Sequence, residues 1–328
     1  MLDSPEVSET RRFLVVGGAG FIGSHLVERL LQRGPVTVFD NLSVGKRTFL
    51  SEALASGRCE LIEGDALDVE ALTRAAAGHH TLFHLAANPE ARWGLDNPRL
   101  DLEQGTIATH NSLEAARRAG VTRFVLSSSG TVYGDTAEPC AEGDLGHLPI
   151  SLYGASKLAG EALVSAYVEC FALTATIFRF GNVVGPRGTH GAALDFLKKL
   201  ERTPEELEVL GDGRQAKPYV HVSDCVEAIL FALDHAEGSL DILNLAPTDT
   251  TSVRRIAELC VAASPYPEAR IRYTGGERGW RGDVARSRLN SEKLAARGHR
   301  LRKSSDEAVR AAVGELALEV FGTRARAL

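Results

Sequence analysis

The sequence predicts an α/β protein built on a doubly wound parallel sheet. Short apolar runs alternate with helical patterns through the first half of the 328 residues, and this alternation is typical of parallel strands joined by crossover helices. The first apolar run passes directly into a glycine-rich turn and then into a helical pattern. Several later runs end in small or polar residues, at the sheet edge where ligands of such folds bind.

Composition sets bounds on the class of protein. With 44% hydrophobic and 24% charged residues, the chain is expected to form an ordinary globular protein with a sizeable core. The net charge of -6 is spread along the sequence, so there is no basic footprint for nucleic acid. No apolar run approaches the roughly 20 residues that a membrane span needs.

The five cysteines predict a reducing compartment. They are odd in number, widely separated and free of CxxC or Cys/His clusters, which argues against a disulfide framework and against a metal site. Residues 1–10 are polar and lack the apolar core of a signal peptide, so they are expected to form a frayed tail. We therefore expect a cytoplasmic protein.

The N-terminal unit reads as strand, glycine turn and helix. The run Phe13-Leu14-Val15-Val16 is followed by glycines at 17, 20 and 23 and by a helical pattern from Ser24 to Gln32. Gly17, Gly20 and Gly23 would let the chain turn sharply, let a pyrophosphate approach the backbone and let the helix pack on the strand. This arrangement indicates a Rossmann-type dinucleotide site, with a purely structural turn as the alternative.

An acidic residue ends the second apolar run. Asp40 follows Val36-Thr37-Val38-Phe39, about 20 residues beyond the glycine turn. A carboxylate there can accept hydrogen bonds from the adenosine ribose and repel a 2′-phosphate, which favours NAD over NADP. Lys46 and Arg47 leave the choice of cofactor open, and Asp40 could instead cap the next turn.

Further strand and helix patterns follow at 59–62, 66–77, 81–85, 108–118 and 123–126. Three stretches come at predicted strand ends, namely 64–66, 85–88 and the serines 127–129. Asp65 is placed to meet the adenine amino group, with a helix N-cap as its alternative. The small residues Ala86 and Ala87 leave room for a cofactor.

Tyr153 and Lys157 are the candidate catalytic pair. Side chains four residues apart lie on one face of a helix, and an ammonium group near a phenol favours the phenolate. Such a pair could act as a general base at neutral pH. The same pattern also occurs where a lysine merely extends past a half-buried ring on an amphipathic helix.

Taken together, the motifs resemble those of extended short-chain dehydrogenases/reductases, in the branch of NAD-dependent nucleotide-sugar epimerases and dehydratases that includes the UDP-glucose 4-epimerases. The matching stretches, in chain order, are Gly17-Gly18-Ala19-Gly20-Phe21-Ile22-Gly23, Asp40-Asn41-Leu42, Gly64-Asp65, His84-Leu85-Ala86-Ala87, Ser127-Ser128-Ser129-Gly130-Thr131-Val132-Tyr133-Gly134, Tyr153-Gly154-Ala155-Ser156-Lys157, Arg179-Phe180-Gly181-Asn182-Val183-Val184-Gly185-Pro186, Gly211-Asp212-Gly213, Tyr219-Val220-His221-Val222-Ser223-Asp224 and Gly282-Asp283-Val284.

The resemblance implies a role for each matching residue. Tyr153 would take a proton from a sugar hydroxyl, Lys157 would bind the nicotinamide ribose and keep Tyr153 ionised, and Ser129 would bond the same sugar oxygen. Ser128 is a further candidate for substrate contact. The residues expected to contact NAD are Gly17, Gly20, Phe21, Ile22, Gly23, Asp40, Asn41, Asp65, Ala66, Leu85, Ala86, Ala87, Ser127, Tyr153 and Lys157.

The residues after Ser129 indicate the reaction. Dehydratases of the family carry an Asp-Glu pair there and decarboxylases usually carry a glutamate before Val-Tyr-Gly, whereas this chain has Gly130 and Thr131. This difference favours epimerisation at C4 of a UDP-sugar through a 4-keto intermediate. The alternatives are another nucleotide-sugar enzyme of the family (dehydratase, decarboxylase or net dehydrogenase) and a catalytically silent NAD-binding sensor.

The second half is expected to hold the nucleotide sugar. We expect residues 1–180 to form the NAD-binding domain and 181–328 mainly the substrate domain, and a return of late segments to the first domain is left open. By resemblance, the substrate-binding candidates are Asn182, Arg187, Lys217, Tyr219, Arg278, Arg281 and Asp283, and one of Arg278 and Arg281 would grip a phosphate.

The sugar and the assembly are less constrained by the sequence. A hexose, an N-acetylhexosamine and a uronic acid all remain open, and a uronate carboxylate could meet Arg92, Arg187 or backbone amides. The helix patterns near 111–118 and 158–171 carry apolar residues on more than one face. Family members commonly dimerise through these helices, so a homodimer is expected.

Overall fold

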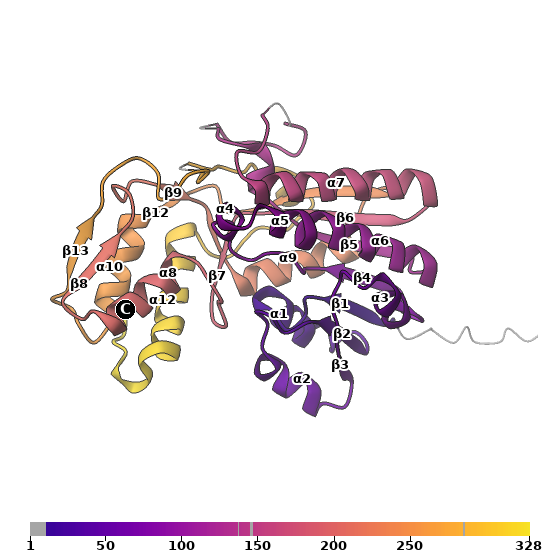
Figure 1. Ribbon diagram of the computed structural model, residues 1–328, viewed down its shortest axis with the longest axis horizontal. Coiled ribbons are helices and arrows are strands. Elements are labelled where there is room, and N and C mark those ends of the chain that lie inside the picture. Colours follow the sequence, from indigo (N-terminus) through magenta and orange to yellow (C-terminus); the bar gives the residue numbers. More distant parts are fainter. Residues whose placement is uncertain (1–10, 137, 145–146, 285) are drawn as a thin grey trace, which may run out of the picture.

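The structure is a computed structural model that describes residues 11–136, 138–144, 147–284 and 286–328. Residues 1–10, for which a frayed tail was expected, lie outside the described residues. The chain forms a larger lobe around a central sheet and a smaller lobe that contains the C-terminus (Figure 1). In the described part of the chain, no helix combines the length and apolar character needed to cross a membrane.

A seven-stranded sheet forms the centre of the larger lobe. Every neighbouring pair in it is parallel, in the order β11-β6-β5-β4-β1-β2-β3, which confirms the predicted doubly wound sheet. The strands are β1 (Phe13–Val16), β2 (Val36–Asp40), β3 (Cys59–Glu63), β4 (Thr81–His84), β5 (Arg123–Ser129), β6 (Thr174–Phe180) and β11 (Leu240–Leu245). Every side chain of β1, β2 and β4 is buried, as the inner strands of a parallel sheet require, whereas the edge strand β3 is only half-buried or exposed.

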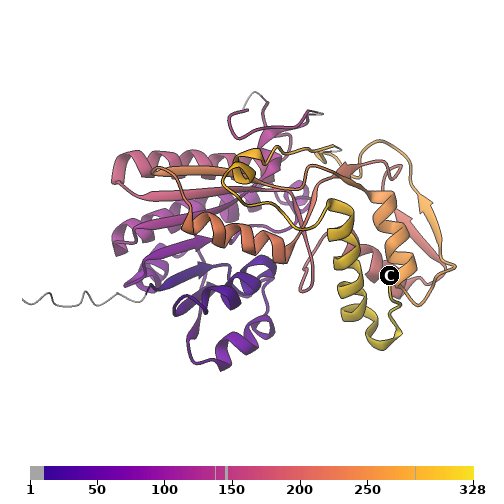
Figure 2. The same cartoon turned by 180° about the vertical axis from the view of Figure 1, so that it is seen from behind.

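Helices cover both faces of this sheet (Figures 1 and 2). On one face, α1 (Phe21–Leu30) and α9 (Val222–Asp234) pack Leu26 and Ile229 into one core. On the other face, a second core contains Leu72, Leu113 and Val164, one from each of α3 (Val69–Ala76), α6 (Ala108–Ala119) and α7 (Leu152–Phe171).

The smaller lobe has its own core, which includes Leu197, Ile256 and Val313. Three two-stranded sheets pair β10 with β7, β12 with β9 and β13 with β8. The elements are β7 (Asn182–Val184), α8 (Ala192–Arg202), β8 (Glu206–Val209), β9 (Ala216–Lys217), β10 (Tyr219–His221), β12 (Thr251–Ser252), α10 (Val253–Ala263), β13 (Arg270–Tyr273) and α12 (Ser305–Phe321).

The chain passes between the lobes more than once. Both α9 and β11 follow residue 181 in sequence but belong to the larger lobe. The late helix α11 (Glu292–Ala296) also lies against β11, where Arg297 pairs with Asp241 at 2.5 Å. The division at residues 180 and 181 stays a prediction about domains.

Short helices connect these elements, and some of them position the first turns of α7. They are η1 (Arg47–Leu50), α2 (Ser51–Ala55), α4 (Trp93–Asp96), α5 (Pro98–Asp101), the π-helix η2 (Leu102–Ile107), η3 (Gly130–Tyr133) and η4 (Gly322–Arg324). Gly105 in η2 approaches α7 so closely that a Cβ there would lie 2.3 Å from Ser156 Oγ. A glycine is therefore required where η2 meets the helix of the candidate catalytic pair.

Candidate active site

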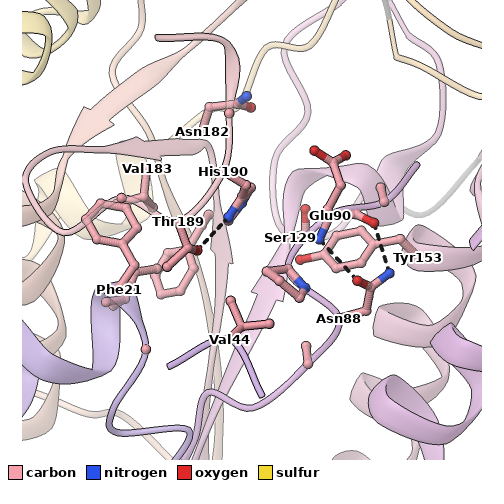
Figure 3. A pocket seen from close by; sticks show the side chains of 18 of the residues that line it. Phe21, Val44, Asn88, Glu90, Ser129, Tyr153, Asn182, Val183, Thr189 and His190 are labelled. Atoms are coloured by element: carbon pink, nitrogen blue, oxygen red, sulfur yellow. Dashed lines mark hydrogen bonds between the residues drawn. The ribbon is translucent and has the colours of Figure 1, made fainter. Parts of the chain in front are cut away.

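A cavity of about 810 Å³ lies between the two lobes. Its wall in the larger lobe includes the glycine turn and the carboxyl ends of β2, β4 and β5, and residues 181–185 and 188–193 supply part of the wall from the smaller lobe. Figure 3 shows side chains of both lobes converging on this space, among them Phe21, Ser129 and Tyr153 from the larger lobe and Asn182 and His190 from the smaller lobe. The site is therefore shared between the lobes.

The candidate catalytic residues meet at one wall of the cavity. Tyr153 lies in the first turn of α7, where the N-cap hydroxyl of Ser151 accepts a hydrogen bond from Gly154 N at 3.1 Å. Lys157 Nζ lies 5.7 Å from the centroid of the Tyr153 ring and donates to the carbonyl oxygen of Ser127 at 2.8 Å. Ser129 ends β5 beside them. The structure thus brings together the three residues predicted from the sequence.

Burial dominates the protonation of this group. It raises the pKa of Tyr153 to about 12, with a further rise from the Asp101 carboxylate and an opposing effect of the hydrogen bond with Ser129. It lowers the pKa of Lys157 to about 8, against the effects of Asp101 and Glu161. The net shift of Tyr153 is therefore opposite to the lowering that the sequence analysis predicted from Lys157.

The glycine turn fits a dinucleotide. Gly17 has φ 83°, and a Cβ on it would lie 2.6 Å from the backbone N of Ala86; a Cβ on Gly23 would lie 2.3 Å from Gly17 O. Helix α1 begins after Gly20 without a side-chain cap, so the N–H groups of its first turn remain available to a phosphate. The turn, the helix start and the cavity together suit a pyrophosphate.

Acidic and amide side chains lie at the other end of the predicted cofactor site. Asp40 lines the cavity, and its carboxylate accepts from Ala19 N and Leu42 N, each at 2.9 Å, while burial raises its pKa. Asp65 accepts from Asn41 Nδ2 at 3.2 Å. The N-cap of α3 is Asp68, so the alternative role given to Asp65 is wrong. The other predicted cofactor residues that line the cavity are Phe21, Ile22, Ala66, Leu85, Ala86, Ala87 and Ser127.

The predicted substrate residues divide into two groups. Asn182, Lys217, Tyr219 and Asp283 line the cavity, and Lys217 Nζ pairs with Asp283 Oδ1 at 2.7 Å. Ser128 also borders the cavity, but its hydroxyl donates to the buried carboxylate of Glu161. Arg179 donates hydrogen bonds to both oxygens of this carboxylate, from Nε to Oε1 and from Nη2 to Oε2.

The structure places three predicted arginines away from the described cavity wall. Arg187 pairs with Glu28 at 2.6 Å, and its backbone N–H donates to Glu319 at 2.8 Å. Arg278 pairs with Asp135 at 2.5 Å, and Arg281 is exposed. A role in binding substrate stays a prediction for all three, and Arg187 and Arg278 already have carboxylate partners.

Sequence analysis named Arg92 as a candidate partner for a uronate but missed the two carboxylates that pair with it in the cavity wall. Arg92 Nη2 lies 2.6 Å from Glu90 Oε2 and 3.1 Å from Asp195 Oδ2, so the pairing spans the two lobes. His190 also lines the cavity, and burial lowers its pKa. In the sequence, only the polar Asn88 after β4 points to a polar site here. The pairing itself could not be predicted from local sequence, because Glu90 and Asp195 are 105 residues apart.

The sheet, the glycine turn and the Ser-Tyr-Lys group define an NAD-binding enzyme of the extended short-chain dehydrogenase/reductase class. Residues 13–246 match the NAD dependent epimerase/dehydratase family, to which the chain belongs. A UDP-glucose 4-epimerase of Mycolicibacterium smegmatis is 34% identical over 86% of this chain and 90% of its own length. A crystal structure of a UDP-galactose 4-epimerase is 38% identical, covers 94% of this chain and 99% of its own, and has a TM-score of 0.84.

Similarity extends to another activity as well. A UDP-N-acetyl-alpha-D-glucosaminuronate decarboxylase of Bacillus cytotoxicus is 33% identical over 76% of this chain and 78% of its own length. The chain is therefore an NAD-dependent enzyme of a family whose members catalyse different reactions on nucleotide sugars. Which of these reactions it catalyses has to be inferred from the residues of its own site.

Proposed function

We propose that the protein is a UDP-sugar 4-epimerase that acts on a neutral hexose, interconverting UDP-glucose and UDP-galactose. The observation that carries this proposal is the surroundings of Ser129. Its Oγ contacts the backbone N and the hydroxyl of Thr131 at 3.2 and 3.0 Å, and Gly130 has no side chain. The Ser129 neighbours therefore provide a hydroxyl but no acid for eliminating water.

The residues of the chain have distinct roles in this reaction. Tyr153 accepts the proton of the sugar 4-hydroxyl, Ser129 donates a hydrogen bond to the same oxygen, and Lys157 supplies the nearby positive charge. Bound NAD supplies hydride acceptance and return at C4. Glu90 is unsuited to be an extra acid: although burial favours its neutral form, its hydrogen bond with Arg92 lowers its pKa overall.

The pairing of the two arginines considered for a uronate favours a neutral sugar. A uronate carboxylate would need a positive partner, and the two arginines considered for it are already paired, Arg92 with Glu90 and Asp195, and Arg187 with Glu28. Two carboxylates around one guanidinium give the Arg92 group a net negative charge, which repels another carboxylate. UDP-glucuronate is therefore expected to be a poor substrate.

The test is product analysis. The purified protein is incubated separately with UDP-glucose, UDP-N-acetylglucosamine and UDP-glucuronate, and the products are followed by mass spectrometry and NMR. An isomer of UDP-glucose of unchanged mass, inverted at C4, is the expected result. A product lighter by water or by carbon dioxide would replace epimerisation with dehydration or decarboxylation.

We also propose a cytoplasmic homodimer. All five cysteines carry free thiols, as a reducing compartment would maintain them. Within the chain, Val164, Tyr167 and Val168 of α7 are already buried, which accounts for part of its second apolar face. Phe171 and Leu152 at the two ends of α7 are 51% and 45% exposed and support a contact with a second copy.

A further inference from the structure

A carboxylate lies buried on α5, the short helix that packs against α7, with only part of its hydrogen-bonding capacity used. Asp101, the last residue of α5, is 1% exposed. Its Oδ1 accepts from Asn88 Nδ2 at 2.9 Å, and its buried Oδ2 has no hydrogen-bond partner in the described part of the chain. Burying an ionised carboxylate with an unpaired oxygen costs free energy of folding, so packing alone does not account for an aspartate at this position.

At two glycines, Gly94 and Gly105, the segment that carries Asp101 comes very close to its neighbours near the start of α7. A Cβ on Gly94 would lie 2.2 Å from Asp101 Oδ2 and 3.7 Å from Leu152 Cβ, so a larger residue at 94 would displace the carboxylate. Gly105, four residues after Asp101, allows the equally close contact with Ser156 described above. The segment from α4 to η2 therefore packs tightly against the first two turns of α7, which carry Tyr153 and Lys157.

We propose that Asp101 is a positioning residue whose buried negative charge keeps Lys157 protonated and sets the pH range in which Tyr153 works. It touches neither substrate nor cofactor in this role, and it acts through the two side chains on α7. The proposal depends on the proposed function only in taking Tyr153 as the base.

The other charges around this pair are already balanced. Glu161 also raises the pKa of Lys157, but its carboxylate is paired with Arg179. His84 borders Lys157 and is neutral, because burial, helped by Lys157, lowers its pKa to about 3. Asp101 raises the pKa of Tyr153 and of Lys157, and it has no ion-pair partner in the described part of the chain that would cancel its charge.

The first test is the pH profile of the Asp101→Asn variant with NAD bound. Removing the carboxylate lowers the pKa of Tyr153 and that of Lys157, so both limbs of the profile should move to lower pH, whichever of the two groups each limb reports. We expect both limbs to shift by about one pH unit, the size typical of a nearby charge. A purely structural role would reduce activity without moving the limbs.

A second readout needs no substrate. The chain has seven lysines, and the 13Cε resonance of Lys157 can be identified by its loss in Lys157→Met. Its titration midpoint should lie near 8 in the unmodified protein and lower in Asp101→Asn. This measurement remains valid whichever sugar is turned over, so it separates a failure of this proposal from a failure of the proposed function.

Asp224→Asn is the matched control. Asp224 is 2% exposed, lies on α9 and is paired with Lys303 and Arg302, so its loss should affect stability without shifting either limb or the Lys157 midpoint. If Asp101→Asn does not fold, the exchanged pair Asn88→Asp with Asp101→Asn retains one carboxylate and should keep the Lys157 midpoint near 8. An unchanged midpoint in Asp101→Asn, or a midpoint in the exchanged pair that falls well below 8, would overturn the proposal.

Discussion

The ammonium group of Lys157 lies 2.8 Å from the backbone carbonyl oxygen of Ser127, so the first turns of α7 are tied to the end of β5. The same strand carries Ser129, two residues further on. The base, its cation and the hydroxyl that bonds the sugar oxygen therefore stand on two rigid elements joined by this hydrogen bond. Pre-organised groups of this kind act without a reorganisation cost during the reaction.

Replacing Tyr153 with Phe should remove the base and leave the NAD site intact. Turnover should fall by a factor of about 10² to 10⁴, the usual contribution of a general base. The measurement is kcat together with the amount of NAD released on denaturation. Unchanged turnover would refute the role of Tyr153, whereas loss of NAD as well would point to a structural effect.

Lys217→Ala should weaken substrate binding more than chemistry. Lys217 lines the cavity as a cation near the predicted diphosphate region, although Asp283 shares its charge. We expect KM for the UDP-sugar to rise about tenfold with kcat nearly unchanged, because the contact is the same in the ground and transition states. Arg214→Ala is the control, since Arg214 is largely exposed. A fall in kcat with unaltered KM would exclude this role.

Freeing Arg92 should change the sugar preference. The double substitution Glu90→Gln with Asp195→Asn removes both carboxylates that hold the guanidinium, at 2.6 and 3.1 Å. The kcat/KM ratio of UDP-glucuronate to UDP-glucose should rise about tenfold, which corresponds to about 1.4 kcal/mol of differential binding. Competition assays with both sugars measure it directly. Arg92→Met in the same background should abolish the gain.

Acid should destabilise the fold through His84. Burial, with a smaller effect of Lys157, lowers its pKa to about 3, and Ser112 Oγ lies 2.9 Å from its Nδ1. Between about pH 6.5 and 3 the unfolded chain binds a proton at this site that the folded chain does not, so stability falls as pH falls, by up to about 1.4 kcal/mol per pH unit. His84→Gln should flatten this slope in urea unfolding, and exposed His110→Gln should not.

Light scattering on a sizing column checks the proposed assembly. The expected mass is twice the 35.2 kDa of the chain. Phe171→Glu places a charge at the exposed end of α7 and should shift the mass toward that of one chain at micromolar concentration. Glu169→Gln on the same helix is the control. A single-chain mass for the unmodified protein would show the prediction of a homodimer to be wrong.

Local patterns predicted much of the larger lobe. The apolar runs beginning at Phe13, Val36, Cys59, Thr81 and Arg123 all form parallel strands, because a short apolar run is a local signal that needs no distant partner to be recognised. The π-helix η2 was not predicted, since its shape depends on the contact of Gly105 with Ser156 in another helix.

The ion pairs between side chains were harder to predict from the sequence than the course of the backbone. Arg187 and Arg278 were assigned to the substrate from their neighbours in sequence, but in the structure Glu28 and Asp135 meet them. Which arginine stays free for a ligand depends on carboxylates more than 140 residues away. Asn182, Lys217 and Asp283 do line the cavity, and their role in binding substrate stays a prediction.

Because β11 pairs with β6 in the sheet of the larger lobe, no single cut in the chain divides the protein into its two lobes. A fragment ending at residue 180 would leave β6 as an open edge and would lack Val226 and Ile229 from the core beside α1. Such an edge is a template for aggregation. Heating the whole protein should therefore melt both lobes in a single calorimetric transition, and a protease nick within residues 181–221 should leave the two pieces associated until they are denatured.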